Sequence, residues 1–103
     1  MKYLQVSWIH SFEDEPILLI SEIDDNGFEI RKIEVYKDDS FGLASLKSDF
    51  GGTLLSEGPV PDIESIKQDP QFLPRFISKE EFEDVWNKYI SILTRGIDPN
   101  EQT

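Results

Sequence analysis

The stretch S-K-E-E-F-E-D-V-W-N-K-Y-I-S-I-L-T, from Ser78 to about Thr94, decides the fold. Ser78 and Glu81 have the spacing of a capping box, in which each side chain accepts a hydrogen bond from the other residue's backbone N–H. Ile77 and Phe82 flank this cap at the spacing of a hydrophobic staple. Apolar residues then recur every three or four positions, which predicts a helix with one broad apolar face formed by Phe82, Val85, Trp86, Tyr89, Ile90 and Leu93.

Four segments that precede this helix have the pattern of β-strands. The first alternates polar and apolar side chains, and the second is the most apolar segment of the chain, so we expect it near the centre of a sheet. The fourth is weaker because Gly42 and Ala44 offer little surface to pack. Turns rich in Asp, Asn and Gly separate the segments. Such short turns predict an antiparallel meander of four strands, at residues 2–10, 17–23, 28–36 and 41–47.

The third predicted strand changes its alternation along its length. Phe28 and Ile30 share one face, whereas Ile33 and Val35 share the other. Either a β-bulge lies near residues 31–32, or both faces of this strand are partly covered.

A long connector with many Gly and Pro residues joins the predicted sheet to the helix. Residues 53–56 have the pattern of a short edge strand, and residues 62–68 that of one or two helical turns. A connector of this length is unusual unless it packs on the domain. We expect it to cover the core through its apolar residues Val60, Ile63, Ile66, Phe72, Leu73 and Phe76.

These patterns predict one α+β domain, residues 1–95, because a chain of 103 residues has the length of a single domain. Its antiparallel sheet of four or five strands is expected to be covered by the C-terminal helix and the irregular connector. Arg95 and Gly96 are suited to ending the helix. Residues 96–103 are then expected to form a flexible tail.

The composition excludes several classes of protein. The chain has no cysteine, so it has no disulfide, no thiol nucleophile and no thiolate metal site. It shows no signal peptide, and no apolar run reaches membrane-spanning length. No hydrolase, zinc, phosphate-loop, calcium-loop or dinucleotide motif occurs. We therefore expect a cytoplasmic protein that is not an enzyme and uses no cofactor or metal.

Charge is the most informative property of the sequence. Ten basic and 21 acidic residues give a net charge of −11. This balance disfavours binding to nucleic acids or anionic membranes, because phosphate binding requires clustered Lys and Arg. It favours a basic protein partner. The alternative is that the acidity only keeps the protein soluble.

One acidic stretch is a candidate partner-binding surface. Between residues 3 and 30 there are seven acidic residues and no Lys or Arg. Because several belong to paired strands or their turn, they are expected to share one side of the sheet and to attract a cationic partner. The alternative is an ordinary solvated face. The seven residues are Glu13, Asp14, Glu15, Glu22, Asp24, Asp25 and Glu29.

His10, the only histidine, is the one candidate for acid–base chemistry. It ends the first predicted strand, near Glu15 in the following turn and near Glu22 on the expected neighbouring strand. A His–carboxylate pair could serve as a general base. A structural role at the strand end is the simpler interpretation, since the sequence shows neither a nucleophile nor a set of metal ligands.

Four segments together carry a resemblance to a known family: W-I-H-S-F-E-D-E-P-I-L-L-I-S-E-I-D-D (8–25), F-E-I-R-K-I-E-V-Y (28–36), G-G-T-L-L-S-E (51–57) and I-S-K-E-E-F-E-D-V-W (77–86). They resemble a family of small bacterial proteins known chiefly as a domain of unknown function. The resemblance extends from Lys2 to Tyr89, and its most specific part is W-x-H…D-E-P…S-E-x-D. It makes Trp8 and His10 candidate signature residues and implies no enzymatic activity.

These observations support three functional hypotheses. The leading one is an immunity or inhibitor protein that neutralises a basic, nuclease-type toxin domain, because small acidic proteins of this kind often accompany toxin systems. The second is a small enzyme or ligand-binding domain that uses His10 with Glu15 or Glu22. The third is an interaction module that dimerises through an exposed sheet edge. The sequence does not specify the oligomeric state.

Overall fold

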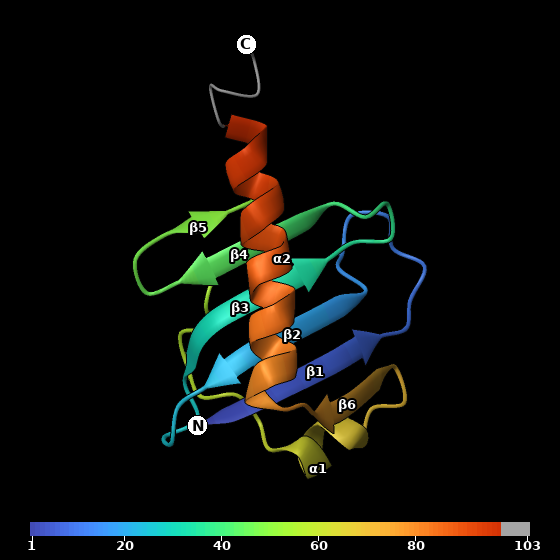
Figure 1. The fold of residues 1–103 in the computed structure, drawn as a ribbon. Helices are drawn as coiled ribbons and strands as arrows, with labels where there is room; N and C mark the ends of the chain where they lie inside the picture. The colour runs from blue at the N-terminus through green and yellow to red at the C-terminus, as the bar shows by residue number, and fades with distance from the viewer. Residues whose placement is uncertain (98–103) are drawn as a thin grey trace.

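The computed structural model describes residues 1–97 and shows a single antiparallel sheet of six strands crossed on one face by a long helix (Figure 1). The strand order is β5-β4-β3-β2-β1-β6. The predicted α+β class is confirmed, with one more strand than the upper prediction. The elements are β1 (Lys2–Trp8), β2 (Leu18–Ile23), β3 (Glu29–Val35), β4 (Phe41–Ser45), β5 (Asp49–Phe50), α1 (Ile63–Lys67), β6 (Phe72–Phe76) and α2 (Lys79–Ile97).

The two ends of the connector differ from the sequence prediction. The predicted edge strand at residues 53–56 is wrong, because β5 ends earlier, at Phe50. Gly51 and Gly52 follow at φ values of 74° and 82°, which turns the chain out of the sheet at positions where other residues would be strained. The Thr53 side chain is then fully buried and donates a hydrogen bond to Glu34 (2.8 Å).

Strand β6 lies inside the segment that was predicted to be irregular. It was missed because Pro74 interrupts it, and proline cannot donate to a sheet ladder. The N–H of Ile9 donates to the carbonyl of Gln71, and the N–H of Ile77 donates to the carbonyl of Tyr3. The backbone N–H and C=O groups of the odd-numbered residues of β6 therefore point toward β1. The nitrogen of Pro74 therefore faces the outer edge of the sheet. That edge is a poor template for pairing with a second chain.

Of the two alternatives for the third strand, the β-bulge is present. The register between β2 and β3 shifts, with Glu22 opposite Arg31 and Ile23 opposite Glu29, so that Ile30 is the additional residue. Without the bulge, Glu29 and Arg31 would lie on the same face of β3. Instead, Arg31 lies on the α2 face and Glu29 lies beneath the connector.

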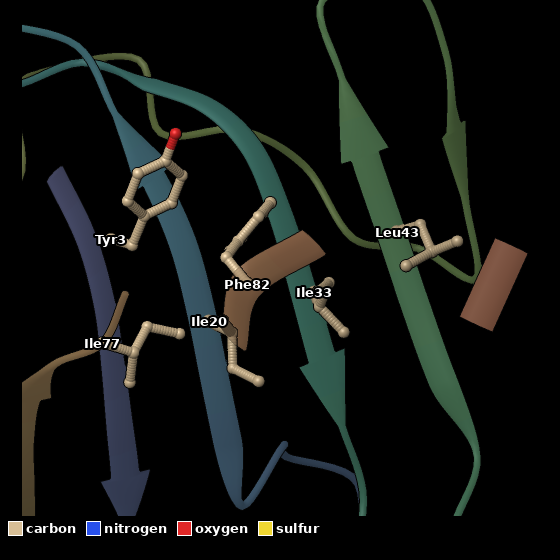
Figure 2. Packing of buried hydrophobic residues seen from close by; sticks show 6 residues of the cluster. All are labelled: Tyr3, Ile20, Ile33, Leu43, Ile77 and Phe82. Carbon is tan, nitrogen blue, oxygen red and sulfur yellow. The ribbon is translucent and has the colours of Figure 1, made fainter. Parts of the chain in front are cut away.

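The hydrophobic core lies between α2 and the sheet, as predicted (Figure 2). Ser78 and Glu81 form the capping box, with N···O distances of 3.1 and 3.0 Å. Ile77 and Phe82 are both buried in the core, in agreement with the hydrophobic staple. The helix begins as predicted and continues to Ile97, beyond the predicted end of the domain. Residues 98–103, most of the predicted tail, lie outside the described residues.

The connector packs on the sheet, as expected, but on the face opposite α2, so that none of its residues 60–76 belongs to the core beneath the helix. Its helical segment α1 is capped by Asp62, which accepts from the N–H of Ser65 at 2.8 Å. The N–H of Val60 donates to the carbonyl of Gly27 at 2.8 Å and fixes the connector to the β2–β3 turn. Both faces of the sheet are therefore occupied.

Replacing Phe82 with Ala is expected to cost about 3–5 kcal/mol of unfolding free energy, because the ring is completely buried and leaves a cavity. Trp86→Ala is expected to cost less, about 2 kcal/mol, because Trp86 is only partly buried. Chemical denaturation of both variants measures the difference. Equal losses, or a larger loss at Trp86, would contradict this account of the core.

Candidate functional site

The seven predicted partner-binding acids are not brought onto one surface. Consecutive turns of an antiparallel meander lie at opposite ends of the sheet, and Figure 1 shows this for the β1–β2 loop and the β2–β3 turn. Glu13, Asp14 and Glu15 therefore lie at one end, and residues 24–25 at the other. The remaining two acids, Glu22 and Glu29, are buried within the sheet.

Glu22 is part of an ion-pair network that joins the sheet to α2. The guanidinium of Arg31 donates to both oxygens of Glu22, at 2.6 and 3.0 Å, and to both oxygens of Glu83, at 2.9 and 2.8 Å. It also lies 4.8 Å from the ring centroid of Phe82 and 5.1 Å from that of Trp86. These hydrogen bonds hold the pKa of Glu22 and of Glu83 below the ordinary value, although burial opposes the shift. The Glu22 carboxylate is thus engaged in the fold.

Glu29 joins the other face of the sheet to the connector. Its carboxylate accepts hydrogen bonds from the hydroxyl of Ser21 and the backbone N–H of Ser56, both at 2.7 Å. The ammonium of Lys32 lies 3.4 Å from the same carboxylate. Only 4% of the Glu29 side chain is exposed, so it cannot contribute to an external docking surface.

The acids of the β2–β3 turn are also engaged locally. Asp24 accepts from the backbone N–H groups of Asn26 and Phe28, at 2.9 and 3.0 Å, which is turn chemistry. The N-terminal ammonium lies 2.8 Å from the Asp25 carboxylate and lowers the pKa of Asp25. This end of the sheet therefore presents less free negative charge than its sequence indicates.

Five exposed carboxylates lie at the opposite end of the sheet, where the β1–β2 loop meets the β3–β4 turn. One of them, Asp38, is engaged locally as Asp24 is, since it accepts from the N–H and the hydroxyl of Ser40. Lys37 connects the two segments through an ion pair of 2.9 Å with Glu13. The five carboxylates and this single ammonium give a net charge of −4. We call this surface the acidic end and define it as Glu13, Asp14, Glu15, Asp38 and Asp39.

Aromatic side chains cluster directly beside the acidic end. The Trp8 ring lies 4.3 Å from His10, 6.4 Å from Phe12 and 5.7 Å from Phe72, measured between centroids. Phe12 is accessible to a partner, since it is 56% exposed. We call this cluster the aromatic corner and define it as Trp8, His10, Phe12 and Phe72.

His10 holds the loop that carries these residues. The N–H of Phe12 donates to Nδ1 of His10 at 3.0 Å, so Nδ1 carries no proton. Nε2 must then carry the proton and donates to the carbonyl of Pro16 at 2.8 Å. Within residues 1–97 the ring bonds to neither Glu15 nor Glu22, and Glu22 lies opposite Tyr3 at the far end of the hairpin. This arrangement supports the structural interpretation of His10.

Phe12, Phe72, Asp38 and Asp39 belong to this surface but were not among the predicted site residues. W-x-H-x-F places three aromatic residues at alternate positions, which was a usable signal. Asp38 and Asp39 are typical turn residues, and Asp39 has a positive φ of 69°. Their proximity to Glu13 depends on the sheet topology and has no signal in the sequence.

Within residues 1–97, no three His, Asp or Glu side chains are grouped closely enough to hold a metal ion. None of the helices in this range combines the length and hydrophobicity needed to cross a bilayer.

The fold is that of a small α+β domain with both faces of its sheet covered. Residues 2–91 match the family model described as a domain of unknown function, DUF6881. The chain belongs to this family. Comparison with curated proteins and with solved structures gives no match.

We expect the stability difference between the wild type and Glu22→Gln to depend on pH. Because Arg31 lowers the pKa of Glu22, the ionised carboxylate stabilises the fold above its ordinary pKa of 4.5, and this contribution is lost as the pH falls through the lowered value. In urea unfolding, the free energy of unfolding of the wild type should exceed that of Glu22→Gln by about 2 kcal/mol near pH 7. This difference should narrow toward about pH 3.

Glu64→Gln provides the matched control, because Glu64 is an exposed carboxylate with only a 3.5 Å contact to Lys67. Glu64→Gln is expected to change the free energy of unfolding by less than about 0.5 kcal/mol at every pH in this range. A Glu22→Gln gap that is independent of pH would show that Arg31 does not stabilise the ionised carboxylate.

Replacing His10 tests its structural role. His10→Ala removes both hydrogen bonds of the ring, whereas His10→Asn can still accept from the N–H of Phe12 through an Asx turn. Amide exchange of Phe12 is expected to rise about tenfold in the Ala variant and much less in the Asn variant. Unchanged exchange in both variants would exclude this role.

Proposed function

We propose that the protein is a non-catalytic inhibitor of the immunity type, which neutralises a basic, nuclease-type toxin domain by binding it. The observation that carries the proposal is the acidic end with the aromatic corner beside it. Exposed apolar side chains next to concentrated negative charge provide both parts of a protein-binding surface: an anchor that excludes water and a rim that attracts cations.

The net charge of the molecule favours a basic protein as the partner. With a net charge of −11, the protein attracts basic proteins over a long range and repels nucleic acids. A nuclease domain must itself present Lys and Arg to the phosphate backbone of its substrate. An acidic protein can occupy that basic surface and so prevent the substrate from binding.

The aromatic corner is expected to supply most of the affinity. Phe12 is a large apolar side chain on the surface, and its ring packs 5.3 Å from His10. It therefore loses little conformational freedom when a partner covers it. Exposed carboxylates contribute chiefly to the association rate, because water and salt screen them.

The enzyme hypothesis gains no support from the site. A general base needs a nitrogen free to take a proton, and both nitrogens of His10 are engaged in the loop. Glu22, its second predicted partner, is bound to Arg31. The dimer hypothesis is also weakened, since β5 has only two residues and Pro74 interrupts the outer edge of β6.

The experiment is capture of a partner from cells that express the neighbouring gene, followed by binding kinetics at two salt concentrations. Neutralising Glu13, Asp14 and Glu15 to the amides is expected to lower the association rate about tenfold at low salt and much less at high salt. Phe12→Ala is expected to raise the dissociation rate and to cost about 2 kcal/mol of binding free energy.

Asp24→Asn together with Asp25→Asn is the matched control, because it removes charge at the opposite end of the sheet. These substitutions should change the association rate less than twofold to threefold, roughly the effect of a distant rim charge. An acidic partner, or equal effects at the two ends of the sheet, would refute the proposed surface. A captured partner without toxin activity would refute the inhibitor class while leaving the surface in place.

A further inference from the structure

A second candidate site lies on the face of the sheet opposite α2. A cleft of about 460 Å³ separates the sheet from the connector, which is within the range of cavities that bury a small organic ligand. Its sheet wall is formed by Leu4, Val6 and Leu19. The facing wall includes Val60 and Phe72. None of these residues belongs to the acidic end.

Hydrogen bonds fix the connector in place on the sheet. The connector is fixed to the sheet where Thr53 donates to Glu34, where the Ser56 N–H donates to Glu29 and where the Val60 N–H donates to Gly27. These contacts are at 2.7–2.8 Å, and Glu29, Ser56 and Val60 also line the cleft. The cleft is therefore largely formed before any ligand enters, which lowers the entropic cost of binding.

The polar groups of the cleft discriminate between ligand charges. Lys32 lies 3.4 Å from Glu29 and 4.0 Å from Glu34, so its ammonium is already balanced by two carboxylates. Asp69 adds a further carboxylate to the lining. Binding of an anionic ligand is disfavoured, because the ligand would lose its hydration beside this excess of negative charge. A cationic ligand would instead neutralise part of the negative charge.

Glu29 has an acceptor position for such a ligand. Its Oε2 accepts one hydrogen bond among the described residues, from Ser21, and a carboxylate oxygen has two lone pairs. We propose that the cleft binds a small organic cation, with an apolar body between β1–β2 and the connector and an ammonium group that donates to Glu29. The cleft shares Phe72 with the surface proposed above for the basic protein, and its other lining residues lie outside that surface.

Three probes of matched shape test the proposal: phenylbutylamine, phenylbutanol and phenylbutyrate, each titrated into the full chain and followed by amide NMR. The amine is expected to cause saturable shifts at Leu19, Ser21 and Val60. The alcohol should bind at least about tenfold more weakly, since it lacks the charge, and the carboxylate should cause no shifts there.

Two variants locate the site. Glu29→Gln is expected to weaken amine binding about tenfold. Because Glu29 also holds the connector, Val60→Trp is the second variant. It fills the cleft without removing a backbone hydrogen bond and should abolish the shifts at Leu19 and Ser21. Glu57→Gln, an exposed neutralisation in the same connector, should leave binding unchanged.

Several results would overturn the proposal. Binding of the amine to Val60→Trp with unchanged affinity would place it outside the cleft, as would shifts confined to residues 13–15 and 38–39. Equal affinity for all three probes would refute the cationic class. The absence of saturable binding by any probe would refute the site.

Discussion

The position of Arg31 is the constraint on which the rest of the structure depends. The bulge at Ile30 turns Arg31 toward α2, where its guanidinium joins a carboxylate of β2 to a carboxylate of the helix. Removing one partner of a fully buried pair typically costs about 3–5 kcal/mol, and the solvent access of Glu83 places this network below that range. The same bulge sends Glu29 to the opposite face, where it fixes the connector.

This division of charge determines which of the seven acids between residues 3 and 30 stay exposed. In the stretch without Lys or Arg, Glu22 and Glu29 are buried within the sheet. Asp24 and Asp25 make local contacts at the β2–β3 turn. The other three, Glu13, Asp14 and Glu15, are exposed at the end of the sheet where two loops meet beside the aromatic corner. A basic partner would therefore meet a localised field with an apolar anchor at its edge, which favours one docking orientation.

Local patterns predicted the elements that depend on local chemistry. The capping box at Ser78, the apolar stripe of α2 and the bulge beside Arg31 all follow from residue spacing. Strand β6 could not be predicted in this way, because it forms only by pairing with β1 at the far end of the chain and tolerates Pro74 only at an edge. The same holds for the candidate site. The structural role of His10 could be predicted from the neighbouring turn, but the ion pair of Glu22 with Arg31 could not, because it depends on the register between β2 and β3.

The central functional claim is that the acidic end and the aromatic corner form the partner-binding surface. The most direct measurement is amide NMR of the labelled protein in complex with its captured partner. The structure predicts the largest changes at residues 9–15 and 38–39, with residues 24–25 unaffected. The largest changes at the β2–β3 turn or along the exposed face of α2, with residues 9–15 unaffected, would contradict the claim.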